Sequence, residues 1–291
     1  MCEALHAKIT DMFQKIPVIA AVPNYNMAES LKVLLPQLLA QSYDAIYVLD
    51  DASTDDSVAV AQSFGSAVRV IQGTKRLGSA GSRNRLLAII QSSKLAPETI
   101  INFVDADVEI LPGQRPLTEI SHDLMEKYPK AGVICPKVLN NDGAWGAFNY
   151  GPSYSWLFGL RNILQARIEI ISKSDMPQAQ KLWKRYDFLL HGFTYPFLTP
   201  KAKQPGHIVE CFMLSTVEAF RIVNGFDGHL PYLEGILFCE QLKRFGYEVW
   251  FDPRFTVKHT QKDVRGWGRY RDVTVAALKL PLRRIIQRLQ S

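Results

Sequence analysis

Short apolar runs rich in β-branched residues alternate with amphipathic helical patterns through the first hundred residues of the chain. The runs at residues 17–23, 45–49, 68–71 and 99–107 are predicted strands, and leucines and isoleucines at helical spacing lie between them. This alternation predicts an α/β fold, with a mostly parallel sheet flanked by helices on both faces. Ligands of such sheets bind where the strands end, so function is expected at the carboxyl edge.

The predicted strand at residues 99–107 ends in two carboxylates, Asp105 and Asp107. In an extended chain, residues i and i+2 point to the same side, so both acids can face one target. Carboxylate oxygens suit Mg²⁺ or Mn²⁺, which usually also bind phosphate oxygens. A solvated turn at the strand end is the alternative. The other predicted strand ends are also polar.

Composition sets the class of protein. With 291 residues, 47% of them hydrophobic and 21% charged, the chain is typical of a soluble globular protein. No apolar run is long enough to span a membrane, and residues 1–15 lack a signal-peptide core, so a cytoplasmic location is expected. The net charge of +6 suits an anionic substrate or an anionic membrane surface. No nucleic-acid partner is expected, and the scattered cysteines are predicted to be buried reduced thiols.

Local signals refine the elements. Asn26 is expected to cap the first helix, and Pro36 to kink or split it. Residues 140–205 are irregular and rich in aromatic residues, which suits either a sugar or lipid acceptor or the packing of a loop-rich subdomain. A helix is predicted at residues 234–245 and a strand at 246–251.

The C-terminal tail, residues 261–291, is predicted to form a basic amphipathic helix. The apolar face consists of Leu282, Ile285, Ile286 and Leu289. The arginines elsewhere on the helix are Arg283, Arg284 and Arg288. Such a helix can lie in a membrane surface, at the inner face of the membrane for a cytoplasmic protein. The alternative is packing on the domain or on another subunit of a homo-oligomer.

Taken together, the loops resemble those of an inverting family-2 glycosyltransferase of the GT-A (Rossmann-like) fold, with a rhamnosyltransferase-like branch as one candidate. The resemblance covers residues 16–137 and 206–260. The motifs that carry it are Pro23-Asn24-Tyr25-Asn26, Asp50-Asp51-Ala52-Ser53-Thr54-Asp55, Gly78 through Arg83-Asn84, Asp105-Ala106-Asp107, Gly225-Phe226-Asp227, Phe245-Gly246-Tyr247 and Val257-Lys258-His259.

The resemblance implies a binding site for the nucleotide of a sugar donor. Tyr25 would stack near the base, with Pro23 and Asn26 beside it. Asp51 would accept the N3–H of uracil or thymine, which favours a UDP-sugar or dTDP-sugar donor, and its alternative role is a helix cap. Arg83 would lie by the diphosphate.

The resemblance also implies a metal site. Asp105 would touch the ribose or the metal, and Asp107 would bind the Mn²⁺ or Mg²⁺ ion that bridges both phosphates. His259 matches a further metal ligand of some relatives, and an imidazole suits Mn²⁺ better than Mg²⁺.

One position departs from the family pattern. Gly235 stands where relatives carry the aspartate that acts as catalytic base. Glu234 is the nearest carboxylate that could replace it, and Asp227 is the next candidate.

The sequence thus predicts a metal-dependent glycosyltransferase that moves a sugar from a nucleotide diphosphate to a hydroxyl of a glycan or lipid-linked acceptor, with inversion. Its GT-A domain would span residues 1–260, with a nucleotide-sugar-binding half at 16–137 and an acceptor half at 138–260. The alternatives are a catalytically impaired nucleotide-sugar-binding protein and, ranked last, a sugar-1-phosphate nucleotidyltransferase.

Overall fold

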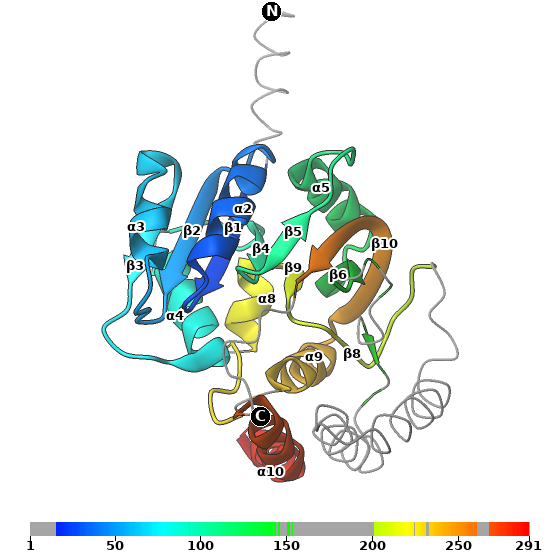
Figure 1. Cartoon of the computed structure of the whole chain (residues 1–291). Coiled ribbons are helices and arrows are strands. Elements are labelled where there is room, and N and C mark those ends of the chain that lie inside the picture. The colour runs from blue at the N-terminus through cyan, green and yellow to red at the C-terminus, as the bar shows by residue number, and fades with distance from the viewer. Residues whose placement is uncertain are drawn as a thin grey trace, which may run out of the picture.

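The computed structural model describes most of the chain outside the aromatic segment (Figure 1). The described residues are 16–92, 94–141, 143, 145, 150–151, 153, 201–223, 225–230, 233–260 and 268–290. The aromatic segment at 140–205, predicted either to bind an acceptor or to pack as a loop-rich subdomain, therefore lies mostly outside the described residues. Two of its aromatic residues, Trp145 and Tyr150, are described, and both pack against Phe251 with ring centroids 6.0 and 4.6 Å away.

An eight-stranded sheet forms the centre of the molecule, in the order β3-β2-β1-β4-β9-β6-β10-β5. Four neighbouring strands are parallel: β1 (Val18–Asn24), β2 (Ala45–Asp50), β3 (Arg69–Gln72) and β4 (Ile100–Val104). The antiparallel strand β9 (Phe212–Thr216) lies between β4 and β6 (Ala131–Leu139).

The sheet continues with β10 (Glu248–His259), which is parallel to β6, and ends with the short antiparallel strand β5 (Val108–Ile110). The strands β7 (Tyr150–Gly151) and β8 (His207–Ile208) form a separate antiparallel pair. The sequence predicted residues 246–251 as a strand and left 255–259 unassigned, whereas β10 runs through both with a register shift between Phe251 and Thr256.

Two hydrophobic cores cover the two faces of the sheet, because side chains alternate along each strand. Val18 and Val22 of β1 join one core, while Ile19 and Ala21 join the other. The helices α2 (Ala28–Leu39), α3 (Ser57–Gln62) and α5 (Leu117–Lys127) pack on the first face, with the short 3-10 helix η1 (Gly65–Ala67) after α3. The helices α4 (Gly78–Ser92), α8 (Val217–Ile222) and α9 (Glu234–Arg244) pack on the second. The predicted α/β fold with a mostly parallel sheet is confirmed.

The described cysteines are part of these cores. Cys135, Cys211 and Cys239 are buried, as predicted, and burial raises the pKa of Cys239 to about 12.

The start of α2 differs from the prediction. Asn26 does not cap the helix: its backbone has a φ of 52°, and its side chain accepts a hydrogen bond from the Thr54 backbone N–H at 2.8 Å. Asp55 instead accepts the backbone N–H groups of Ala28 and Ser57, both at 3.0 Å, and so satisfies donors at the starts of α2 and α3. The side chain that caps α2 thus comes from the loop after β2.

Pro36 does not split α2, which is a single helix around it. Its ring lies on the exposed side of the helix, while Leu34, Leu35 and Leu38 are fully buried. Burial of these leucines supports the helix through the position where the proline removes a backbone hydrogen bond.

The C-terminal helix α10 (Gly268–Gln290) lies beside α9 at the edge of the molecule (Figure 1). Its fully buried Leu280 packs with Ile236 and Leu237 of α9. Arg284 of α10 donates to Glu240 of α9 at 2.7 Å. One side of the predicted amphipathic helix therefore packs on the domain.

The outer side of α10 carries exposed apolar side chains. Leu278, Leu282 and Ile285 are 66%, 59% and 55% exposed. Within the described part of the chain, no helix has the length and apolar character needed to cross a bilayer.

Candidate functional site

A group of metal-ligand side chains lies at the carboxyl end of β4. The sequence predicted that Asp105 and Asp107 belong to the extended strand, and this is wrong. Both lie in the turn that follows β4, where the Val108 N–H donates to the Asp105 carbonyl at 3.0 Å. Residue His259 reaches the same place because β10 pairs with β5, opposite Val108. One ligand atom from each of Asp105, Asp107 and His259 lies within 4.8 Å of the others.

These three side chains fit a divalent cation. They offer carboxylate oxygen and imidazole nitrogen, a donor set that accepts Mn²⁺ readily and Mg²⁺ through its oxygens. His259 Nε2 lies 3.2 Å from Asp107 Oδ1. Burial lowers the pKa of His259, but contacts with Cys211 and Asp107 outweigh it and raise the pKa well above its ordinary value. A metal ion would therefore bind in place of a proton.

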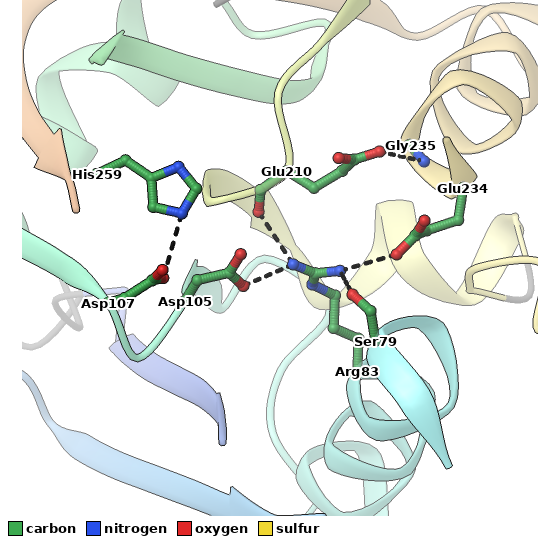
Figure 2. A network of polar contacts seen from close by, with 8 residues as sticks. All are labelled: Ser79, Arg83, Asp105, Asp107, Glu210, Glu234, Gly235 and His259. Carbon is green, nitrogen blue, oxygen red and sulfur yellow. Dashed lines mark hydrogen bonds and ion pairs between the residues drawn. The ribbon is translucent and has the colours of Figure 1, made fainter. Parts of the chain in front are cut away.

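Arg83 of α4 links this cluster to α9 (Figure 2). Its guanidinium is 2% exposed and donates to Asp105 at 2.6 Å and to Glu234 at 3.2 Å. It also donates to the Ser79 hydroxyl and, at 3.3 Å, to the Glu210 carbonyl. The Nε atom of Arg83 is buried without a hydrogen-bond partner in the described part of the chain. The arginine predicted beside the diphosphate thus holds the acids of the site in place.

The residues predicted to bind the nucleotide lie at the ends of β1 and β2. Pro23 is paired with Leu49 in these neighbouring strands. Tyr25 lies under the guanidinium of Arg76, 4.1 Å from the ring centroid. Both are partly exposed at the same edge of the sheet as the metal-ligand group.

Asp51 is already engaged in the fold. It is 4% exposed, and its two oxygens accept the backbone N–H groups of Leu77 at 2.7 Å and Gly78 at 2.8 Å. Asp51 therefore holds the start of α4. This is the helix-capping role that the sequence offered as the alternative to nucleotide binding. An ionised carboxylate has about four acceptor positions, so Asp51 retains capacity for a further donor.

The two candidate bases have different surroundings. Glu234 is the first residue of α9, follows Leu233 with a φ of 65°, and is 4% exposed beside Arg83. Asp227 is also buried, and its carboxylate accepts hydrogen bonds from Arg283 of α10 at 2.7 Å and from the His229 N–H at 2.9 Å. The structure brings Glu234 into contact with the network around Asp105 through Arg83.

Sequence reasoning missed three residues of this region. Arg76 covers Tyr25. The Asn84 side chain accepts from the Phe226 N–H and donates to the Phe226 carbonyl, both at 2.7 Å, and so holds the Gly-Phe-Asp turn. Glu210 places its carboxylate against Gly235. Asn84 stands in a motif that the sequence singled out, whereas no local pattern distinguishes Glu210.

This sheet, with its metal-ligand group at the carboxyl edge of the parallel strands, has the architecture of a GT-A protein. The chain belongs to the glycosyl transferase family 2, whose family model matches residues 19–186. No match was found among curated proteins.

Solved structures share the fold. The chain is similar to S. aureus TarS 1-349 in complex with UDP-GlcNAc, with a TM-score of 0.52, 15% identity, and coverage of 85% of this chain and 59% of TarS 1-349. It is also similar to glucosyl-3-phosphoglycerate synthase from Mycobacterium tuberculosis in complex with Mn²⁺, UDP and glucosyl-3-phosphoglycerate, with a TM-score of 0.52, 14% identity, and coverage of 94% and 82%. It spans 44% of the length of a GalNAc-T7 structure, at a TM-score of 0.49.

Proposed function

We propose that this family-2 glycosyltransferase transfers a sugar from a nucleotide-diphosphate donor to an acceptor hydroxyl, with inversion and with Mn²⁺ or Mg²⁺. The observation that carries the proposal is the convergence of Asp105, Asp107 and His259 at the sheet edge, from segments far apart in sequence. A UDP or dTDP donor is favoured because Asp51, beside this edge, can accept an N3–H. Neighbours of the same fold are recorded with UDP-GlcNAc, and with UDP and Mn²⁺.

In this proposal Asp105, Asp107 and His259 hold the metal, which when bound offsets the negative charge that develops on the leaving diphosphate. Tyr25 supplies an aromatic face for the base of the nucleotide, and Arg76 lies where it can cover the bound nucleotide. Arg83 orients Asp105 at 2.6 Å and brings a positive charge towards the diphosphate.

The acceptor is a hydroxyl of a glycan or a lipid-linked carrier. A hydroxyl is a poor nucleophile at neutral pH, so a carboxylate must accept its proton as the new bond forms. The two alternative functions predict different results. A binding protein without catalysis would bind the donor but not cleave it, and a nucleotidyltransferase would need a sugar-1-phosphate.

A thermal-shift screen tests the proposal. Purified protein is heated with UDP-, GDP- and dTDP-sugars, with and without Mn²⁺. Ligand at about a hundredfold over its dissociation constant stabilises by about 2.7 kcal/mol, so a UDP-sugar or dTDP-sugar should raise the melting temperature only when Mn²⁺ is present.

Matched variants localise the effect. Asp107→Ala should remove the Mn²⁺-dependent shift while the protein stays folded, because it deletes one ligand of the cluster. Glu109→Ala is the control, since this acid lies in β5 and faces Lys258 at 3.5 Å. Unchanged metal dependence in Asp107→Ala would show that the metal binds elsewhere.

We also propose that α10 contacts an anionic membrane surface through its outer side. The exposed apolar side chains Leu278, Leu282 and Ile285 support this. The double variant Leu282→Asp/Ile285→Asp should reduce co-sedimentation with phosphatidylglycerol vesicles and leave donor binding unchanged. If the variant instead loses self-association seen by light scattering, the surface serves a homo-oligomer.

A further inference from the structure

Gly235 lies where the resemblance places the catalytic aspartate, and the space beside it is filled by another carboxylate. A Cβ atom added to Gly235 would lie 2.4 Å from Oε1 of Glu210, and 2.5 and 2.7 Å from its Cγ and Cδ. Glu210 Oε1 also accepts the Gly235 backbone N–H at 2.7 Å. The missing side chain at 235 is therefore replaced in space by the end of Glu210 (Figure 2).

Glu210 is held in this position from both sides. It lies in the loop between β8 and β9, and its carbonyl accepts Arg83 at 3.3 Å. The carbonyl of the next residue, Cys211, accepts the Asp105 N–H at 2.9 Å. Its carboxylate is thus tied to the start of α9, while its backbone is tied to the turn that carries the metal-ligand acids. The second carboxylate oxygen has no hydrogen-bond partner within the described ranges.

We propose that Glu210 is the catalytic base, supplied from the β8–β9 loop in place of a side chain at Gly235. This inference rests on the proposed function. In the step, the acceptor oxygen forms a bond to the anomeric carbon, and its proton moves to a Glu210 oxygen. The bond from the anomeric carbon to the diphosphate oxygen breaks at the same time, and its electron pair leaves with the diphosphate.

The charges around Glu210 support this role. The pKa of Glu210 is raised to about 7, mainly by burial and then by the neighbouring Glu234, with a smaller upward effect from Asp105, while Arg83 and the Gly235 N–H oppose the rise. A base with a pKa near 7 is matched to proton transfer at neutral pH.

The two acids favoured by the sequence are less suited. Glu234 is 4% exposed, and its carboxylate is paired with the Arg83 guanidinium. The two carboxylate oxygens of Asp227 accept hydrogen bonds, one from Arg283 and the other from the His229 N–H. Glu234 is instead a positioning residue that fixes Arg83 and sets the charge next to Glu210.

The test moves the carboxylate between the two positions. Release of UDP from UDP-N-acetylglucosamine and UDP-glucose is measured with Mn²⁺, and UDP binding is followed by calorimetry. Glu210→Gln should lower turnover by roughly 10²–10⁴-fold while UDP affinity stays nearly unchanged. The amide can still accept the Gly235 N–H, so the fold is preserved.

The exchange variant Glu210→Ala/Gly235→Asp should turn over at least about tenfold faster than Glu210→Ala, because it returns a carboxylate to the same space from α9. The matched control Glu210→Ala/Gly235→Ala fills the space without a carboxylate and should recover nothing. Gly235→Asp alone should lose activity, because its side chain collides with Glu210.

The outcomes separate this inference from the proposed function. Full turnover in Glu210→Gln, or equal recovery by both double variants, would overturn the role of Glu210 and leave the glycosyltransferase in place. Wild-type protein that neither binds nor cleaves any nucleotide sugar would overturn the proposed function and the base with it.

Discussion

Arg83→Met tests the network that holds the acids of the site together. Arg83 is 2% exposed and pairs with Asp105 and Glu234 at 2.6 and 3.2 Å. At an effective dielectric constant of about 20, a pair of unit charges about 4 Å apart gains about 4 kcal/mol. Desolvation offsets part of the gain from the two pairs. Removing one partner of such a buried pair costs about 3–5 kcal/mol, which is the expected loss in the free energy of unfolding.

The loss should depend on pH. Arg83 lowers the pKa of both Glu210 and Asp105, so its removal raises both pKa values further above those of the unfolded chain. An acid with a raised pKa in the folded state binds protons more tightly there, so its contribution to stability is present at low pH and is lost as the pH rises. Arg83→Met should therefore cost more at pH 8 than at pH 5.5.

Urea unfolding at both pH values, with EDTA present, measures the effect. Arg115→Met is the control, because Arg115 pairs with Glu119 and Asp123 while its side chain is 60% exposed. It should change stability little, and that small effect should be screened by salt. Equal losses in both variants, or a loss for Arg83→Met that does not vary with pH, would refute the reasoning.

Three further predictions follow from other contacts. Asn84→Ala removes both hydrogen bonds to the Gly-Phe-Asp turn and should cost about 1–3 kcal/mol in urea unfolding; unchanged stability would show that the turn holds itself. Asp55→Ala leaves two helix starts without an acceptor and should cost about 1–2 kcal/mol, whereas no change in melting would mean that water replaces it. Glu234→Gln removes a charge that raises the pKa of Glu210, so the acidic limb of the pH–rate profile should shift to lower pH, with turnover at its plateau within about tenfold of the wild type; a far larger loss without a shift would make Glu234 the base.

The elements of the fold could be predicted from the sequence because their signals are local. Strand and helix periods are set by neighbouring residues, and the alternation of β-branched runs with helical spacing led to the correct class of sheet. Single capping residues were less predictable. The acceptor that caps α2 comes from Asp55, 27 residues away, and competes with the nearer Asn26.

The sequence by itself determined the family, the fold class and the acids at the end of β4. Only the tertiary structure shows how residues far apart in the sequence are brought together there. His259 reaches Asp107 across 152 residues through the pairing of β10 with β5. Glu210 reaches Gly235 because β9 inserts between β4 and β6 and carries its preceding loop to the start of α9. The chemistry of a carboxylate depends on burial and on the charges within a few ångströms, and strand order sets these distances.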